Sequence, residues 1–166
     1  MKLKQLTFDA LLTAIALTIF MIEAQIPAPI PIPGIKLGLA NIITVFAMFA
    51  FTPKDALLIL SVRVFLGSIF SGQISTMLYS GAGGILCFLV MLFMRRILTD
   101  RQIWVSSIIG AVFHNIGQIL VAILVTGTPG IAIYLPILMV SGIAAGLFTG
   151  ICAQVLYQKL QKHNIF

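Results

Sequence analysis

TMLYSGAGGILCFLVMLFMRR, residues 76–96, decides the fold class of this chain. No acidic or basic side chain interrupts the block from Thr76 to Met94, and two arginines follow it directly. A helix needs about 20 mostly apolar residues to cross the hydrocarbon core of a bilayer. The block therefore predicts a transmembrane helix whose C-terminal end lies at a basic membrane face.

Five further apolar blocks flank this one. The 166 residues are 60% hydrophobic and 8% charged, whereas a soluble domain carries about 25% charged residues. The gaps between blocks are short, so the length leaves no room for a soluble catalytic domain. We expect a single all-α domain over residues 1–166, an integral membrane bundle of six transmembrane helices. The expected spans are Phe8–Ile26, Leu37–Phe51, Asp55–Phe70, Thr76–Met94, Trp104–Val125 and Ile131–Tyr157.

The basic side chains fall in alternate gaps between these blocks. Eight of the ten would lie on one membrane side: Lys2, Lys4, Lys54, Arg95, Arg96, Arg101, Lys159 and Lys162. The opposite side holds Lys36, and Arg63 lies inside a span. The positive-inside rule therefore predicts a multi-pass protein of the bacterial cytoplasmic membrane with both termini cytoplasmic. The net charge of +6 then reflects membrane orientation, and nucleic acid is not an expected partner.

Local signals mark the ends of the spans. Thr52-Pro-Lys-Asp55 predicts an N-cap with proline at the first helical position and a carboxylate at N3. Thr99 and Gln102 have capping-box spacing before the fifth span. The stretch from Pro27 to Gly34 alternates prolines and predicts an extended outer loop that cannot continue a helix. No small-residue cleavage site ends the first span, so we expect a retained helix.

Enzyme motifs are absent from the sequence. The acidic residues Asp9, Glu23, Asp55 and Asp100 are each isolated, so no paired-aspartate Mg²⁺ site is expected. Neither a phosphate-binding G-x-x-x-x-G-K-[ST] loop nor a G-x-S-x-G nucleophile elbow occurs. Cys87 and Cys152 lie far apart inside apolar blocks, as small packing residues do. We expect no enzyme activity, no metal site and no cofactor.

Arg63 is a charged residue inside an otherwise apolar span. Counting about 1.5 Å per helical residue from the inner end of its span places it near the middle of the bilayer. A charge there costs at least ~2.5 kcal/mol, so its side chain must face a partner or water. Glu23, in the outer half of the first span, allows two interpretations. Glu23 and Arg63 form a structural ion pair, or Arg63 binds an anionic group of a ligand while Glu23 orients it.

Other polar residues gather at the same depth or further out. His114, Asn115 and Gln118 share a side of the fifth span, and Asn41 lies at the outer end of the second. Hydrogen bonds between helices would explain any one of them. Together with Arg63 they predict the wall of an outward-facing pocket. The proline loop and the segment that follows it would cover this pocket, and Lys36 would attract anionic ligands.

Small residues form two further patterns. Ala10 and Ala14 lie four residues apart on one face of the first span, and the sixth span has Gly142, Gly146 and Gly150 at the same spacing. Such stripes let helices approach closely. For the sixth span we expect packing within the bundle. For Ala10 and Ala14, packing within the bundle and docking of a partner both remain open.

The sequence resembles a known family over residues 33–118. The likeness lies in Pro33-Gly-Ile-Lys-Leu-Gly-Leu-Ala-Asn-Ile42, Arg63-Val-Phe-Leu-Gly67, Leu78-Tyr-Ser-Gly-Ala-Gly-Gly84 and Gly110-Ala-Val-Phe-His-Asn-Ile-Gly-Gln118. These segments resemble the membrane family labelled heptaprenyl diphosphate synthase component I, also called the Gx transporter family. That family is similar in architecture to the substrate-binding S components of energy-coupling factor (ECF) transporters. The resemblance implies six helices, an outward site capped by the first loop, and an Ala-x-x-x-Ala face that docks on a coupling subunit.

Two functional hypotheses follow, with a third that the sequence disfavours. The first is an S component that binds a small vitamin-, flavin- or quinone/isoprenoid-precursor-like molecule, with an ECF coupling membrane subunit and ATPases as partners and lipid around it. Its site residues would be Glu23, Lys36, Asn41, Arg63, His114, Asn115 and Gln118, and its docking residues Ala10 and Ala14. The second is a non-catalytic membrane partner of prenyl diphosphate or menaquinone synthesis, or of flavin-based electron export. A membrane prenyltransferase is disfavoured because the aspartate pairs are missing.

Overall fold

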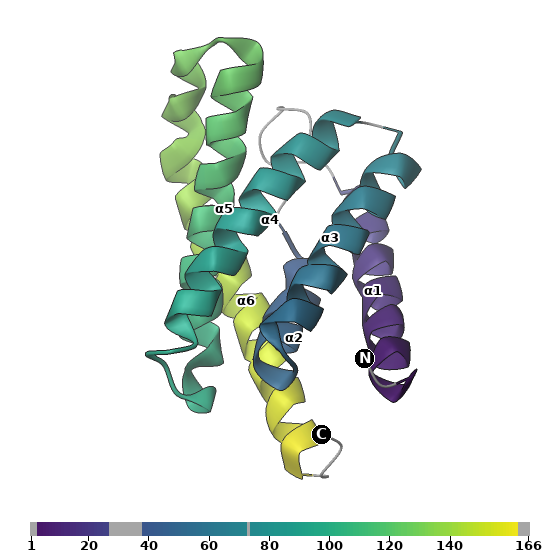
Figure 1. The fold of residues 1–166 in the computed structure, drawn as a ribbon. Helices are drawn as coiled ribbons and strands as arrows, with labels where there is room; N and C mark the ends of the chain where they lie inside the picture. The colour runs from purple at the N-terminus through teal and green to yellow at the C-terminus, as the bar shows by residue number, and fades with distance from the viewer. Residues whose placement is uncertain (1–2, 27–37, 73, 163–166) are drawn as a thin grey trace.

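A computed structural model describes residues 3–26, 38–72 and 74–162, and these residues form an all-helical bundle (Figure 1). The helices are α1 (Leu3–Glu23), α2 (Asn41–Ala50), α3 (Pro53–Phe70), α4 (Ile74–Met94), α5 (Ile103–Thr126) and α6 (Leu135–Lys162). Short 3₁₀ helices, η1 (Asp100–Gln102) and η2 (Pro129–Tyr134), precede α5 and α6. The expected fold class, an all-α bundle of six helices, is confirmed.

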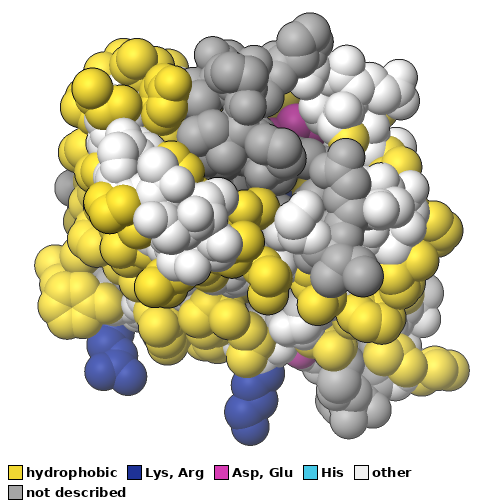
Figure 2. All heavy atoms as spheres, turned by 90° about the horizontal axis from the view of Figure 1, so that it is seen from above, with side chains coloured by type: hydrophobic (Ala, Val, Ile, Leu, Met, Phe, Trp, Pro, Cys, Tyr) yellow, Lys and Arg dark blue, Asp and Glu magenta, His cyan; other side chains and the backbone are white. Residues whose placement is uncertain are grey.

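Four helical segments of the described chain are long and apolar enough to cross a membrane, namely Gln5–Glu23, Met77–Met94, Asp100–Thr126 and Pro129–Lys162. Helix α2 is only 10 residues long, and α3 carries Lys54, Asp55 and Arg63 within its 18 residues. Seen from above, hydrophobic side chains line most of the outline of the molecule, as lipid contact requires (Figure 2). The protein is therefore a membrane protein, and the expectation that all six helices span stays a prediction.

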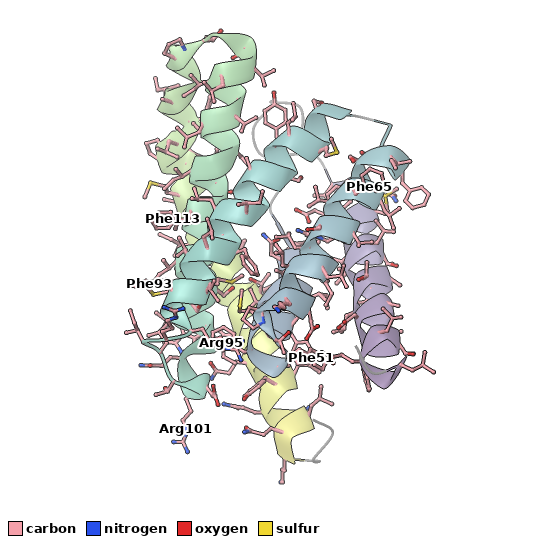
Figure 3. The ribbon with its side chains drawn as sticks, in the orientation of Figure 1. Phe51, Phe65, Phe93, Arg95, Arg101 and Phe113 are labelled. Carbon is pink, nitrogen blue, oxygen red and sulfur yellow. The ribbon has the colours of Figure 1, made fainter. Side chains whose placement is uncertain are left out.

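The two termini lie at the same end of the bundle (Figure 1). Arg95 and Arg101 lie at this end too, in the connection between α4 and α5 (Figure 3). Arg95 and Arg101 thus lie at the end of the bundle where the positive-inside pattern places them. The assignment of this end to the cytoplasm follows from that rule and stays a prediction.

Both predicted helix caps are confirmed. The Asp55 N–H donates to Thr52 Oγ1 (3.4 Å), and Asp55 Oδ2 accepts from the Thr52 N–H (3.0 Å), with Pro53 at the first helical position. Gln102 Oε1 accepts from both the N–H and the hydroxyl of Thr99 (3.2 Å each). These contacts satisfy backbone donors that an uncapped helix would leave open, so α3 and the η1–α5 unit begin where the sequence predicts.

Most helix boundaries differ from the expected spans by a few residues, the starts of three helices among them. Helix α2 begins at Asn41 instead of residue 37, because Gly38 has a left-handed φ of +81° that a helix cannot include. Helix α1 begins already at Leu3, before its apolar block. The start of the last span, Ile131–Tyr134, is a 3₁₀ helix, and α6 proper begins at Leu135. The proline loop and Lys36 lie outside the described residues.

Glycines bring α4, α5 and α6 into backbone contact. A Cβ built on Gly117 of α5 would lie 2.9 Å from the Gly83 Cα of α4, and one on Gly146 of α6 would lie 2.8 Å from the Ile108 Cα of α5. Gly150 is equally tight against Trp104. The expected role of the sixth-span glycines in bundle packing is confirmed. These three helices form a tightly packed half of the molecule.

Helix α2 is the buried centre of the other half. Eight of its ten residues are buried, among them Phe46 and Met48 with almost no exposed surface. A helix that is apolar all round is expected in a core. Its side chains pack with Ile59 of α3 and Met91 of α4 in one cluster, so α2 connects α1 and α3 to the tightly packed half.

We predict that Gly146→Leu destabilises the bundle, because its side chain would meet the α5 backbone. Overpacking of this kind costs about 1–3 kcal/mol of unfolding free energy. Ala144→Leu is the matched control, since position 144 is exposed on the same helix. Reversible unfolding in detergent measures both variants, and equal stabilities would contradict the proposed packing.

Candidate functional site

Glu23, the last residue of α1, binds the backbone that leads into α2. Its carboxylate accepts hydrogen bonds from the N–H of Gly38 and from the N–H of Ala40 (3.4 Å). The side chain is buried, with 3% of its surface exposed. Because Gly38 adopts the left-handed conformation, the chain can present both N–H groups to one carboxylate. Glu23 therefore anchors the segment Gly38–Ala40 over the C-terminal end of α1.

Arg63 lies in the interior, with 3% of its surface exposed. Its Nη2 donates to Asn41 Oδ1 at the start of α2 (3.0 Å), whereas its Nε has no hydrogen-bond partner. Glu23 is near enough to act on Arg63 electrostatically. The two interpretations left open by the sequence, an ion pair with Glu23 and the binding of an anionic ligand group, both stay predictions. The described hydrogen bond of Arg63 goes to Asn41, and one guanidinium donor stays available.

His114 comes from the other half of the molecule and meets the same segment. A Cβ on Gly83 of α4 would lie 3.0 Å from His114 Nδ1, and one on Gly38 would lie 3.9 Å from His114 Cδ2 and 3.0 Å from Asn41 Nδ2. The imidazole is therefore held between α4 and the start of α2. It is buried against the backbone of Gly83, and its Nδ1 meets no hydrogen-bond partner in good geometry.

Two more buried polar side chains lie near these groups by helix geometry. Gln118 is one turn outward from His114 on the same face of α5, with 0% of its surface exposed. Neither its Oε1 nor its Nε2 has a hydrogen-bond partner. Thr44 is one turn inward from Asn41 on α2, and its buried hydroxyl is also without a partner. An unsatisfied buried polar group costs about 1–3 kcal/mol.

We refer to Asn41, Thr44, Arg63, His114 and Gln118 as the polar cluster. They come from α2, α3 and α5, and both halves of the bundle contribute. Arg63 lies ten residues from the start of α3 and His114 eleven from the start of α5, which corresponds to about 15 Å of helix in each case. The unpaired donors and acceptors at Arg63, Thr44, His114 and Gln118 are suited to binding a polar ligand.

A small cavity lies beside Asn41, one member of the polar cluster. It has a volume of about 10 Å³ and touches Gly38, Asn41, Cys87, Ser107 and Thr149. The hydroxyl groups of Ser107 and Thr149 are hydrogen-bonded to each other across α5 and α6 (3.0 Å). This volume is close to the smallest that holds one water molecule. The cavity is therefore small and mainly apolar, with the paired hydroxyl groups of Ser107 and Thr149 in its lining.

The other predicted site residues lie elsewhere. Asn115 Nδ2 donates to the Leu138 carbonyl of α6, and Gly142 makes room for this contact, since a Cβ there would lie 2.6 Å from Nδ2. Asn115 thus joins α5 to α6, the interhelical role that the sequence also allowed. Ala10 and Ala14 are exposed on α1. Lys36 lies outside the described residues.

Thr44 is the cluster member that sequence reasoning missed. The spacing Asn41-x-x-Thr44 places the two side chains on one helix face and was a usable signal. The role of Glu23 as an acceptor for backbone N–H groups could not be anticipated, because it depends on the path of Gly38. Within the described ranges, no group of three His, Cys, Asp or Glu side chains could hold a metal ion.

We predict that Gln118→Met stabilises the ligand-free protein by about 1–3 kcal/mol, because it replaces an unsatisfied buried amide with an apolar side chain of similar size. Asn115→Leu is the contrasting variant and should destabilise the protein, because it removes the hydrogen bond to Leu138. Unfolding in detergent without added ligand measures both. Equal losses of stability would show that Gln118 is also a structural residue.

Comparison with known proteins identifies a family for this chain. No curated protein and no solved structure matches the chain. A family model described as heptaprenyl diphosphate synthase component I matches residues 12–156, a range that includes the whole polar cluster. The likeness of this architecture to ECF S components stays a prediction. The chain belongs to the heptaprenyl diphosphate synthase component I family.

Proposed function

We propose that this protein is the substrate-binding subunit of an ECF-type importer in the bacterial cytoplasmic membrane. The observation that supports this is the set of buried, unpaired polar groups at Arg63, Thr44, His114 and Gln118. In a chain with so few polar residues inside its helices, such groups are costly unless a ligand completes their hydrogen bonds. The ligand would be a small vitamin-, flavin- or quinone/isoprenoid-precursor-like molecule.

In this proposal each residue in and around the polar cluster has its own role. The Nε of Arg63 would bind an anionic or carbonyl oxygen, while Asn41 fixes the guanidinium from the other side. His114 and Gln118 would supply further donors and acceptors. Glu23 would hold the covering segment, and Lys36 would attract the ligand. The chain itself would carry out no catalysis.

The test is to purify the protein in mild detergent from native membranes and to identify the proteins and small molecules that remain bound. Recovery of a coupling membrane subunit with two ATPases and a metabolite supports the importer. Arg63→Ala should lose the metabolite by at least about tenfold, equivalent to 1.4 kcal/mol, while the protein stays folded. Arg101→Ala is the control, because Arg101 is exposed at the end of the bundle that holds the termini. Undiminished metabolite in Arg63→Ala would contradict the site.

A second candidate function is a non-catalytic membrane partner of prenyl diphosphate or menaquinone synthesis, or of flavin-based electron export. The family description, a component of a heptaprenyl diphosphate synthase, favours the first of these. Such a partner would dock through exposed small residues and would connect this chain to prenyl substrates. Recovery of a prenyl synthase without a bound metabolite would favour this function.

We predict that Ala14→Leu releases the partner proteins but leaves any bound metabolite in place. Ala14 is exposed on α1, so a larger side chain there would separate the docked surfaces without disturbing the polar cluster. Ile15→Leu, which keeps the side-chain volume at an exposed neighbouring position, should have no effect. The partner-to-protein ratio in the purified complex is the measurement. An unchanged ratio in Ala14→Leu would remove this face from the docking site.

A further inference from the structure

A polar pocket lies between η1 and the last turns of α6, at the end of the bundle that holds the termini. It has a volume of about 530 Å³, and its lining is formed by Asp100, Arg101, Tyr157, Gln158 and Gln161. Volumes of about 300–1,000 Å³ are typical of sites for small molecules. The pocket shares no residue with the polar cluster, so it is a separate candidate site.

The residues around this pocket place it at the level of the lipid headgroups. Trp104, with 39% of its surface exposed, lies in the first turn of α5, and Tyr157 lies near the end of α6. Trp and Tyr side chains are enriched where a membrane meets water. Lys159 and Lys162 follow in the last turn of α6, and such long basic side chains reach from a helix end to the membrane surface. A molecule in the pocket therefore lies beside the headgroups of the bilayer.

The charge around the pocket favours an anion. Residues 95–102 and 157–162, which contain its lining, carry five basic side chains and one acidic side chain, namely Arg95, Arg96, Arg101, Lys159 and Lys162 against Asp100. Arg95 and Arg101 both lie at this end of the bundle (Figure 3). Arg95 acts electrostatically on Tyr157, and its buried Nη1 has no hydrogen-bond partner among the described residues. Basic clusters beside membrane helices attract the headgroups of anionic lipids.

The carboxylate in the pocket limits the negative charge of an occupant. Asp100 Oδ2 accepts a hydrogen bond from the Tyr157 hydroxyl (3.1 Å), which fixes the carboxylate in the lining. A phosphomonoester carries a charge of about −1.5 to −2 at pH 7, so this carboxylate repels it more strongly than a phosphodiester with one negative charge. The carboxylate and the two glutamine side chains also accept hydrogen bonds. A singly charged phosphodiester that carries hydroxyl groups meets both conditions.

We propose that this pocket binds the headgroup of phosphatidylglycerol, with the phosphodiester at Arg101 and the glycerol hydroxyls at Asp100 and the glutamines. Phosphatidylethanolamine also offers donors, but its headgroup has no net charge, so the excess of basic residues favours the glycerol lipid. The proposal involves neither the polar cluster nor the exposed face of α1. It therefore stands independently of both candidate functions.

The test is native mass spectrometry of the purified full-length protein in detergent. The added lipids are phosphatidylglycerol, phosphatidylethanolamine and phosphatidic acid with identical acyl chains. We expect the phosphatidylglycerol complex to be at least about fivefold more abundant than either of the others. Glycerol 3-phosphate, a soluble phosphomonoester, should not displace the lipid.

Two arginine variants separate the pocket from general surface charge. Arg101→Ala should weaken phosphatidylglycerol binding at least about tenfold, because it removes a charged donor from the lining. Arg96→Ala is the matched control, since it removes the same charge from an exposed side chain outside the lining. It should change binding less than about threefold. Size-exclusion chromatography selects the folded variants.

Asp100→Asn tests the basis of headgroup selection. The amide keeps the shape of the side chain but removes its negative charge. The variant should therefore lose the discrimination against phosphatidic acid and bind both lipids equally. Retained discrimination in the folded variant would contradict the role of Asp100.

Three further results would overturn the proposal. Equal losses in Arg101→Ala and Arg96→Ala would assign the lipid to general surface charge. Equal or tighter binding of phosphatidic acid or phosphatidylethanolamine by the unmodified protein would remove the selectivity for glycerol. Displacement by glycerol 3-phosphate would assign the pocket to soluble phosphate esters. Arg101→Ala should keep the metabolite of the importer test, so a failure here and a failure of the proposed function are distinguishable.

Discussion

A guanidinium group in the interior of a membrane bundle is the constraint on which the rest of the arrangement depends. Arg63 costs about 2.5–3.5 kcal/mol at mid-membrane even on the lowest scale, unless its donors are satisfied. Asn41 satisfies one of them, which requires the start of α2 to lie beside the middle of α3. Glu23 contributes a nearby opposite charge. The start of α2 and the anchored segment before it thus lie where they can accommodate this one charge.

The two halves of the bundle are held together by different means. Helices α4, α5 and α6 approach to backbone contact through glycines such as Gly117 and Gly146, and hydrogen bonds from Asn115 and Ser107 join α5 to α6. The half formed by α1, α2 and α3 depends on Glu23, Asn41 and Arg63 instead. The polar cluster lies where these halves meet. On one side of the cluster, His114 and Gln118 project from the helices that glycines pack together. On the other side, hydrogen bonds of Glu23 and Arg63 fix the positions of the helices.

The sequence predicted the parts of this structure that local chemistry determines. Apolar block lengths gave the six helices, and the Thr52–Asp55 spacing gave the start of α3, because both depend on neighbouring residues alone. Arg63 was identified by its cost in the bilayer. The partners of polar groups were harder, because they depend on how helices rotate and approach. Asn115 shares a helix face with His114 and Gln118, yet a difference of 100° around α5 directs it to α6. The sequence places Glu23 in the outer half of the first span. Its role as an acceptor for backbone N–H groups depends on the path of Gly38, which the sequence does not reveal.

The hydrogen bond between Arg63 and Asn41 has a consequence for access to the interior. Asn41 directly follows the segment that Glu23 anchors, so a movement of this segment away from α3 separates Asn41 from the guanidinium. Water that enters would hydrate Arg63 and replace the lost hydrogen bond. In the arrangement described, the charge is held by protein, and after such a movement solvent would replace Asn41. Hydration of a single buried cation would thus offset part of the free energy needed to move the Gly38–Ala40 segment.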